Sequence, residues 1–372
     1  MFFDPWLLHK IFGRLKAEFC RPPEPLPCAA RRVATLPVNG PHIPVETALN
    51  SRCNSDATGN QNYHHWGMLA TDTQLAPQHI AGLVDRANAL PGLYGKKASV
   101  AADVNILSCS AASAEDKLTK NTLMISSGMQ QQAIGLMCAA LGIGMVFQNC
   151  GMDGEVNANR IMTTKIEVHP MLPSYGNSYW TTAAPALRRP WKPGNLPDPD
   201  RRGEKSLMDV LAGLTVKHTG TRQVTESVVS QLLWAAKGRT PHLYKAKPWG
   251  MTIPFWTDKL DMTTAYAVMR NRIYTYSNWQ SGLPTHCLLQ PLDCPVDIMS
   301  CCGCADAFTT CILISVNRDY ACAWWEAGYI LLNLLVQATA LDISYEAALV
   351  NDACSQSFKN ARIEKAAVVV AF

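Results

Sequence analysis

The sequence predicts an α+β protein of two similar halves around a pseudo-two-fold axis, with antiparallel-rich sheets flanked by long buried helices. Three observations lead to this prediction. The same order of helices and strands is expected twice along the 372 residues. The phrase Ala-Leu-Gly-Ile-Gly at 140–144 returns at 340–344 as Ala-Leu-Asp-Ile-Ser. A stretch rich in proline and aromatic residues, 170–203, separates the two copies. Two copies of one unit in a chain are expected to pack as the subunits of a homodimer do.

The chain divides into four predicted parts. They are a helix and proline-rich connector in 1–44, the first half in 45–169, a proline- and aromatic-rich strap in 170–205, and the second half in 206–372. The first helix is amphipathic and aromatic, so it can dock on its own domain, which we favour, or touch a membrane surface. A stretch as long as the strap with so little periodicity is usually functional or a linker, and its aromatic residues indicate that it packs onto the protein.

Apolar periodicity places the helices and strands of the first half. The predicted helices are 45–51, a second that begins at Leu75 and stops at Pro91, and 118–141, broken or kinked near Gly128. The predicted strands are 98–107, 145–147 and 163–168. Proline followed by glycine ends the second helix, since proline cannot continue it.

The second half repeats this order. Its predicted helices are 206–213, 225–237 and 324–341, and its predicted strands are 262–276 and 366–372. Leu83 and Val84 of the first half align with Leu232 and Leu233 of the second. The alignment of 49–52 with 211–214 is looser.

The end of the long helix in the first half is the most informative segment. A buried helix over 129–141 is expected to end at Gly142, where glycine can take the positive φ that closes a helix. Gly144 follows, and Gln148 and Asn149 begin a polar, glycine-rich turn. Such a segment can be an ordinary helix cap in a core, or it can let a flat ring approach the main chain closely.

Composition excludes several classes of function. With 48% hydrophobic and 17% charged residues, a net charge of +4 and no dense run of Lys or Arg, no nucleic-acid surface is predicted. The longest apolar run, 133–147, is shorter than the roughly 18 residues of a membrane span. No secretory signal is predicted in 1–19. We therefore expect the 14 cysteines to be reduced thiols in a cytoplasmic protein.

Two stretches of the second half resemble a known family. They are 230–238, Ser-Gln-Leu-Leu-Trp-Ala-Ala-Lys-Gly, and the long apolar helix phrase at 325–341. They resemble the FMN-dependent nitroreductase family, in the branch around the azoline-oxidising SagB-like dehydrogenases. The resemblance covers 45–168 weakly and 206–372 more clearly. It implies an α+β fold, FMN held at a dimer interface, hydride transfer through flavin N5, and here a tandem fusion of two subunits into one pseudo-dimer.

The resemblance also implies where FMN would bind. The family holds the flavin phosphate with an arginine-serine phrase on its first helix, and a guanidinium matches phosphate bidentately. A segment of the partner subunit covers the ring. The implied cofactor-binding residues are Ser51, Arg52 and Cys53 at the phosphate, Gly142, Gly144, Gln148 and Asn149 at the ring or its polar edge, and Thr252, Ile253 and Pro254 as the cover. No catalytic residue and no metal ligand is assigned.

The second half departs from this pattern at the matching positions. Leu214 replaces the arginine, which leaves Lys217 as the nearest cation, and Asp342 and Ser344 replace the two glycines. An aspartate beside a phosphate or an anionic ring edge is unfavourable. We therefore expect a single flavin site, built on the first half. The lysine-tyrosine pair of azoline oxidases is absent from 314–318, which argues against azoline oxidation.

Two hypotheses of function result. The first is an FMN-dependent oxidoreductase with one flavin between the halves, acting on a small-molecule substrate and an electron donor that the sequence does not name. Such a chain could pair further as a homodimer of pseudo-dimers. The alternative is a flavin-free pseudoenzyme or binding protein that retains the fold. The cysteines of 294–311 are interpreted as buried thiols, because their spacing matches no zinc or iron–sulfur motif.

Overall fold

The computed structural model describes part of the 372-residue chain. The described residues are 33–34, 42–52, 74–111, 116–147, 162–170, 195–240, 250–254, 262–269, 272–280, 283–292, 308–317, 320–350, 358–359, 363 and 365–372. The chain forms two units, Met1–Arg32 and Val33–Phe372, and every described residue belongs to the second. The predicted first helix and most of the predicted strap therefore lie outside the described residues.

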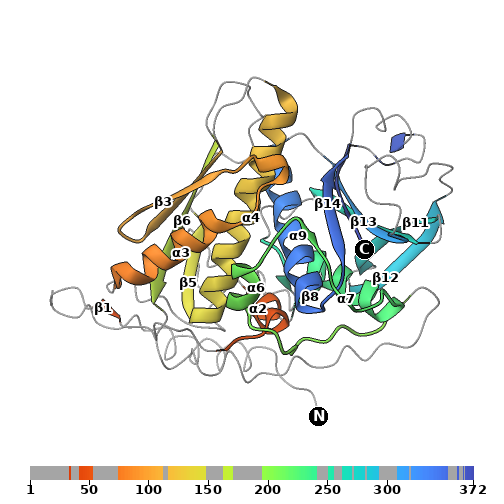
Figure 1. The fold of residues 1–372 in the computed structure, drawn as a ribbon, viewed down its shortest axis with the longest axis horizontal. Coiled ribbons are helices and arrows are strands. Elements are labelled where there is room, and N and C mark those ends of the chain that lie inside the picture. The colour runs from red at the N-terminus through yellow and green to blue at the C-terminus, as the bar shows by residue number, and fades with distance from the viewer. Residues whose placement is uncertain are drawn as a thin grey trace, which may run out of the picture. The chain divides into compact units, whose positions relative to one another are not determined.

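The first half of the second unit holds three helices and a four-stranded sheet (Figure 1). The helices are α2 (Val45–Ser51), α3 (Pro77–Ala89) and α4 (Lys117–Leu141), with a short 3-10 turn, η2 (Leu93–Gly95), after α3. The sheet strands are β3 (Ser99–Asp103), β4 (Ile106–Ala111), β5 (Ile143–Phe147) and β6 (Met162–Pro170). Their order in the sheet is β3-β4-β6-β5, and every neighbouring pair is antiparallel. Two short strands, β1 (Val33–Ala34) and β2 (Gln74–Leu75), pair separately.

The described part of the second half contains three helices and a seven-stranded sheet. The helices are α6 (Leu207–Ala212), α7 (Glu226–Lys237) and α9 (Ala321–Ala340). The sheet strands are β7 (Lys217–His218), β10 (Thr263–Met269), β11 (Arg272–Gln280), β12 (Leu283–Leu292), β13 (Thr310–Val316), β14 (Tyr345–Leu349) and β15 (Ala366–Ala371). Their order is β12-β11-β10-β13-β15-β14-β7. A short pair, β8 (Arg239–Thr240) and β9 (Gly250–Met251), lies outside this sheet.

The two sheets share a core of equal topology. In the first, α4 falls in the chain between β4 and β5; in the second, α9 falls between β13 and β14. The order β10-β13-β15-β14 then matches β3-β4-β6-β5 strand for strand, again with antiparallel neighbours throughout. The hairpin β11–β12 is an addition beside β10. The mixture of helices and antiparallel sheets confirms the predicted α+β class.

The helices α4 and α9 cross in close contact between the two sheets (Figure 1). A Cβ atom on Gly128 would collide with the main chain of Trp325, and one on Gly328 would collide with the main chain of Ile125. Glycine is therefore required on both helices at this crossing. The predicted kink near Gly128 is wrong: α4 is one continuous helix, because the glycine admits a neighbouring backbone rather than breaking its own.

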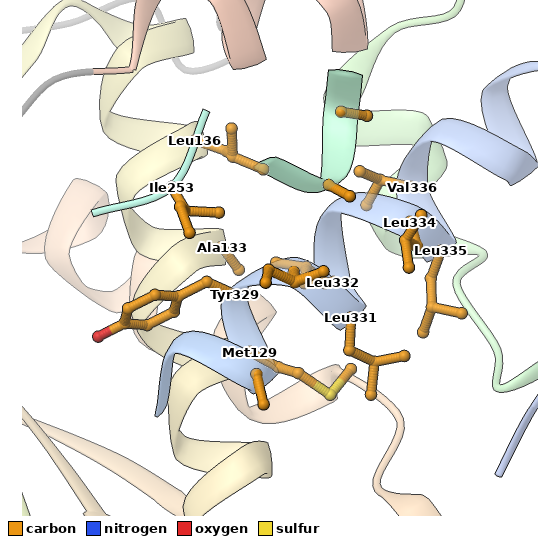
Figure 2. Packing of buried hydrophobic residues seen from close by; sticks show 14 of the residues in the cluster. Met129, Ala133, Leu136, Ile253, Tyr329, Leu331, Leu332, Leu334, Leu335 and Val336 are labelled. Carbon is orange, nitrogen blue, oxygen red and sulfur yellow. The ribbon is translucent and has the colours of Figure 1, made fainter. Parts of the chain in front are cut away.

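The ends of α4 follow from local chemistry. Asp116 is the N-cap and accepts a hydrogen bond from the Thr119 backbone N–H at 2.7 Å. Gly142 ends the helix at φ 68° and ψ 32°, as predicted. Nearly all of α4 is buried, and with α9 it forms the centre of a large apolar cluster (Figure 2). Among the described residues, none of the helices combines the length and the apolar character that a membrane span requires.

Candidate functional site

Arg52 joins the first half to a short segment of the second. Arg52 directly follows α2 and is 4% exposed. Its Nε donates to the Thr252 carbonyl oxygen at 3.1 Å, and its Nη2 donates to those of Met251 at 3.0 Å and Ile253 at 2.7 Å. The aliphatic part of the side chain packs at Gly135 of α4. The structure thus brings together Arg52 and the 252–254 segment, which the sequence assigned to opposite walls of one site.

The Thr252 carbonyl oxygen is the meeting point of three side chains. Besides Arg52, it accepts hydrogen bonds from Gln132 Nε2 at 2.9 Å and from Asn333 Nδ2 at 3.3 Å. Gln132 Nε2 also donates to Asn333 Oδ1 at 2.8 Å, and Asn333 Nδ2 donates to the Ala235 carbonyl at 2.9 Å. The end of α2 and the helices α4 and α9 are therefore tied to one main-chain oxygen, and Asn333 links α7 to the same group.

The side chains of this segment face protein. Thr252 and Ile253 are both fully buried at 0% exposure, and Pro254 is buried as well. Figure 2 shows Ile253 in the apolar cluster with Ala133 and Leu136 of α4. An open space of the size of a flavin ring would leave accessible surface on the side chains that line it. The described side chains at 252–253 therefore pack in the core of the junction.

One acceptor in this junction is unsatisfied. Gln132 Oε1 is buried and has no hydrogen-bond partner, while its Nε2 makes the two bonds described above. An unpaired buried acceptor costs roughly 1–3 kcal/mol, so the surrounding contacts must compensate.

The end of α4 has a different character. Gly142 is partly exposed, and among the described residues no atom beyond its chain neighbours lies within 4 Å of the position that a Cβ would take. It lies seven residues beyond Gly135, about 10 Å along the helix from the Arg52 contact. Gly144 follows in β5, opposite His169 of β6. Cys53, Gln148 and Asn149 lie outside the described residues, as does the side chain of Ser51.

The matching end of α9 is bonded to residues 220–222. Asp342 has the same left-handed backbone as Gly142, with φ 58°. Its carbonyl oxygen accepts from the Thr221 and Arg222 backbone N–H groups at 3.0 and 2.9 Å, and its carboxylate accepts from Thr221 Oγ1. That hydrogen bond is the main reason that the pKa of Asp342 is lowered. Ser344 Oγ accepts from the Gly220 N–H at 2.9 Å and donates to the Gly220 carbonyl at 3.0 Å.

Asp342 and Ser344, which stand where the first half has glycines, therefore have a structural role. The side chains of Asp342 and Ser344 add to the main-chain bonds that hold residues 220–221 against the end of α9, and glycines would lack these side-chain bonds. Lys217 lies on the surface and forms an ion pair with Glu346 of β14 at 2.9 Å, with its side chain 65% exposed. Lys217 thus makes its contact with a carboxylate of the adjacent strand.

Sequence reasoning missed two buried polar clusters. Lys237, at the end of α7, pairs with Glu326 of α9 at 2.8 Å, and both contact Thr263 of β10. This pair ties three elements of the second half together. A lysine at the end of an apolar helix carries no sequence signal for its partner.

The second cluster contains Ser230, His286 and Tyr276. Ser230 Oγ donates to the Pro197 carbonyl at 2.5 Å and lies 2.7 Å from His286 Nε2, while the Tyr276 hydroxyl lies 2.8 Å from Nδ1. A hydroxyl has one hydrogen to donate, so Nε2 must donate to Ser230 Oγ. Ser230 is therefore not activated as a nucleophile, and the cluster anchors residue 197 to β12.

Glu46 forms a further link between the halves. Its Oε1 accepts from Gln337 Nε2 of α9 at 2.6 Å, and its Oε2 is buried without a hydrogen-bond partner, packed against Gly203. Desolvation by burial raises the pKa of the Glu46 carboxyl, and the Gln337 bond opposes this only in part.

The described cysteines behave as core residues. Cys109, Cys138, Cys287, Cys311 and Cys322 are all buried. Burial strongly raises the pKa of the Cys109 and Cys138 thiols, which makes them unreactive. Within the described part of the chain, no group of His, Cys, Asp and Glu could hold a metal ion. Cys294, Cys301, Cys302 and Cys304 lie outside it.

Comparison with known proteins gives two similar folds at low identity. No protein-family model matches the sequence, and no curated protein matches it. A crystal structure described as a "putative nitroreductase" from Ralstonia eutropha JMP134 is 18% identical, with a TM-score of 0.34, over 48% of this chain and 87% of that one. A second, described in the same words and from Anabaena variabilis ATCC 29413, is 11% identical, with a TM-score of 0.46, over 72% of this chain and 68% of that one.

Proposed function

We propose that this chain is a flavin oxidoreductase of the nitroreductase type, with two similar halves and a single FMN site built on the first half. The observation that carries the proposal is the contrast between the two helix ends. Gly142 leaves open space at the end of α4, whereas Asp342 and Ser344 hold protein over the end of α9. A ligand could therefore approach the main chain at Gly142, whereas residues 220–222 are bonded to the main chain and side chains at the α9 end.

Two reciprocal contacts support the pseudo-two-fold arrangement. Gly128 meets Trp325 and Gly328 meets Ile125, and adding 200 to each number of one helix gives its counterpart on the other. The matched strand orders β3-β4-β6-β5 and β10-β13-β15-β14 agree with it. In an isologous interface, residue i contacts j and j contacts i, as these pairs do.

The starts of the two halves meet in the same reciprocal way. Val45 N–H donates to the Lys205 carbonyl at 3.0 Å, and Leu207 N–H donates to the Ile43 carbonyl at 2.9 Å. These residues flank Pro44 and Ser206, which precede α2 and α6. Equivalent helices therefore begin side by side.

The residues present fit FMN in part. FMN would supply hydride transfer, while Gly142, Gly144, Gln148 and Asn149 would line its ring and Thr252 to Pro254 would form the wall from the second half. The open backbone at Gly142 fits this role. The phosphate role of Arg52, with Ser51 and Cys53, stays a prediction, and it requires N–H groups that now donate to Met251, Thr252 and Ile253.

The setting of the site remains as the sequence indicates. The reduced cysteines and modest charge support a cytoplasmic enzyme with a small-molecule substrate and a separate electron donor. Further pairing into a homodimer of pseudo-dimers is part of the same proposal.

One observation favours the alternative, a flavin-free protein that retains the fold. Arg52 is bonded to main-chain carbonyls, and Thr252 and Ile253 have no accessible surface. A chain that had lost its cofactor would close its junction in this way.

The absorbance spectrum of the purified chain and an FMN titration separate the two functions. The flavin proposal expects visible flavin bands, or quenching of FMN fluorescence on titration. Gly142→Leu should weaken FMN binding, because the added side chain fills the open space. Gly95→Leu is the matched control, because Gly95 also has a positive φ, 72°, and open space around it. A colourless chain that leaves FMN fluorescence unchanged would establish the alternative.

A further inference from the structure

We infer that Arg52, Gln132 and Asn333 are positioning residues that hold the main chain of 251–253, and that Arg52 does not bind the flavin phosphate. The inference rests on the proposed function for its flavin part only. All three side chains donate to the Thr252 carbonyl oxygen. These hydrogen bonds fix the 251–253 segment of the second half against the first half, beside the proposed site.

The geometry of the guanidinium excludes a second bidentate partner. Arginine grips a phosphate through two parallel N–H bonds, either from Nε and Nη2 or from Nη1 and Nη2. Both edges use Nη2, whose two hydrogens match its two acceptors, the carbonyls of Met251 and Ile253. The Nε hydrogen is directed to Thr252. Each bidentate edge of Arg52 is therefore already used within the protein.

The main chain at 251–253 is shaped around this group. In an extended strand, successive carbonyls point to opposite sides. Here three successive carbonyls reach one guanidinium, so the segment bends around Arg52. Arg52, Gln132 and Asn333 are at most 4% exposed, so all three donors act in a dry junction where hydrogen bonds are strong.

This attachment acts on the main chain of 251–253. Carbonyl oxygens belong to every residue type. A segment that is held by its carbonyl oxygens can therefore tolerate substitutions while its position stays fixed, provided that the apolar packing of Ile253 is kept.

Comparison of FMN with riboflavin tests the phosphate part, because the two ligands differ only by the phosphate. If Arg52 positions the 251–253 segment, Arg52→Ala lowers the affinity for FMN and the affinity for riboflavin by the same factor, within about two-fold. Asn333→Ala, which removes another donor to the same carbonyl, should behave alike. A loss of FMN affinity of about ten-fold or more with unchanged riboflavin affinity would assign Arg52 to the phosphate and overturn the inference.

Thermal unfolding tests the positioning part without any flavin. Arg52→Ala, Gln132→Ala and Asn333→Ala should each lower Tm, with Arg52→Ala losing on the order of 5 °C. Lys217→Ala is the control, because its exposed ion pair is of little weight and Tm should stay within about 1 °C. An Arg52→Ala chain as stable as the wild type would refute the inference.

Two details keep the outcomes separable. If Arg52→Ala does not fold, Arg52→Lys and Asn333→Ala decide, since a lysine has its three donors on one nitrogen and cannot span the three carbonyls. If the wild-type chain takes up neither flavin, the proposed function fails. The Tm series then decides the positioning role alone.

Discussion

Replacement of Gly128 by alanine tests the crossing of α4 and α9 directly. The new Cβ would collide with the carbonyl oxygen of Trp325, with the Trp325 Cα 2.8 Å away and its carbonyl carbon 2.9 Å away. All three are main-chain atoms of a buried helix, so the two helices must separate. Overpacking of a core costs typically 1–3 kcal/mol, and alanine regains at most about 1 kcal/mol of helix propensity. We expect a net loss of about 1–2 kcal/mol.

Gly135→Ala is the matched control on the same helix. There the nearest atoms are the Met145 sulfur at 3.3 Å, in a flexible side chain, and the Arg52 Cδ at 3.5 Å, which is an ordinary van der Waals distance. The propensity gain then dominates, so this variant should be neutral or more stable by up to about 1 kcal/mol. Gly328→Ala should behave as Gly128→Ala does, since it meets the Ile125 carbonyl in the reciprocal contact.

Urea unfolding followed by circular dichroism measures these differences as shifts of the midpoint at constant slope. The decisive comparison is between Gly128→Ala and Gly135→Ala. If both variants are as stable as the wild type, the two backbones do not touch at this crossing, and the reciprocal contact loses its support.

Three further predictions concern buried and junction groups. Burial raises the pKa of Glu46 in the folded chain, so its contribution to stability is full below the usual pKa of 4.5 and is lost as pH rises through the folded value. Glu46→Gln should remove this fall in stability with rising pH, and Tm measured from pH 4 to 8 checks it. Lys237→Ala should cost about 3–5 kcal/mol in urea unfolding, because it leaves the Glu326 carboxylate buried and unpaired, and Lys237→Met with Glu326→Leu should recover much of it. Ser344→Ala should speed amide hydrogen exchange at Gly220, which loses its side-chain acceptor, with little change in Tm.

Helices were the most predictable part of the fold. The ranges 45–51, 225–237 and 324–341 agree with α2, α7 and α9 to within a few residues, because apolar side chains recur there at helical spacing. The predicted cap at Gly142 is also confirmed. Glycine inside a helix was misleading. At Gly128 it marks a backbone contact that depends on a residue about 200 positions away.

Strands were harder to predict for a physical reason. The single strand expected at 98–107 is the hairpin β3–β4, which turns at Val104 with φ 53°, where no glycine or proline gives a signal. The expected strand at 262–276 is likewise two strands, β10 and β11. Strand pairing in a sheet depends on contacts between distant segments. For this reason the strands β12 and β13 were not predicted.

The candidate site was predictable only at the level of its segments. The resemblance placed Arg52 at the flavin phosphate and Thr252 in the covering segment of the same site, and the structure brings the two residues into contact. The partners Gln132 and Asn333 carry no such signal, because a lone amide in an apolar helix resembles any polar interruption of a core. The sequence also could not show which atom of Thr252 accepts these hydrogen bonds, since the acceptor is a main-chain oxygen.

Under the proposed function, fusion of two subunits would explain how one helix end could close while the other stayed open. In a homodimer, both sites carry the same sequence, so a substitution that closes one closes both. In a single chain with two similar halves, Asp342 and Ser344 can hold residues 220–221 over the end of α9 without any change at Gly142. Under the proposed function, the second half then contributes walls and stability, and only the first half is kept open for a ligand. If Asp342→Gly with Ser344→Gly left hydrogen exchange at 220–221 unchanged, those side chains would not close the second end, and this account of its asymmetry would fail.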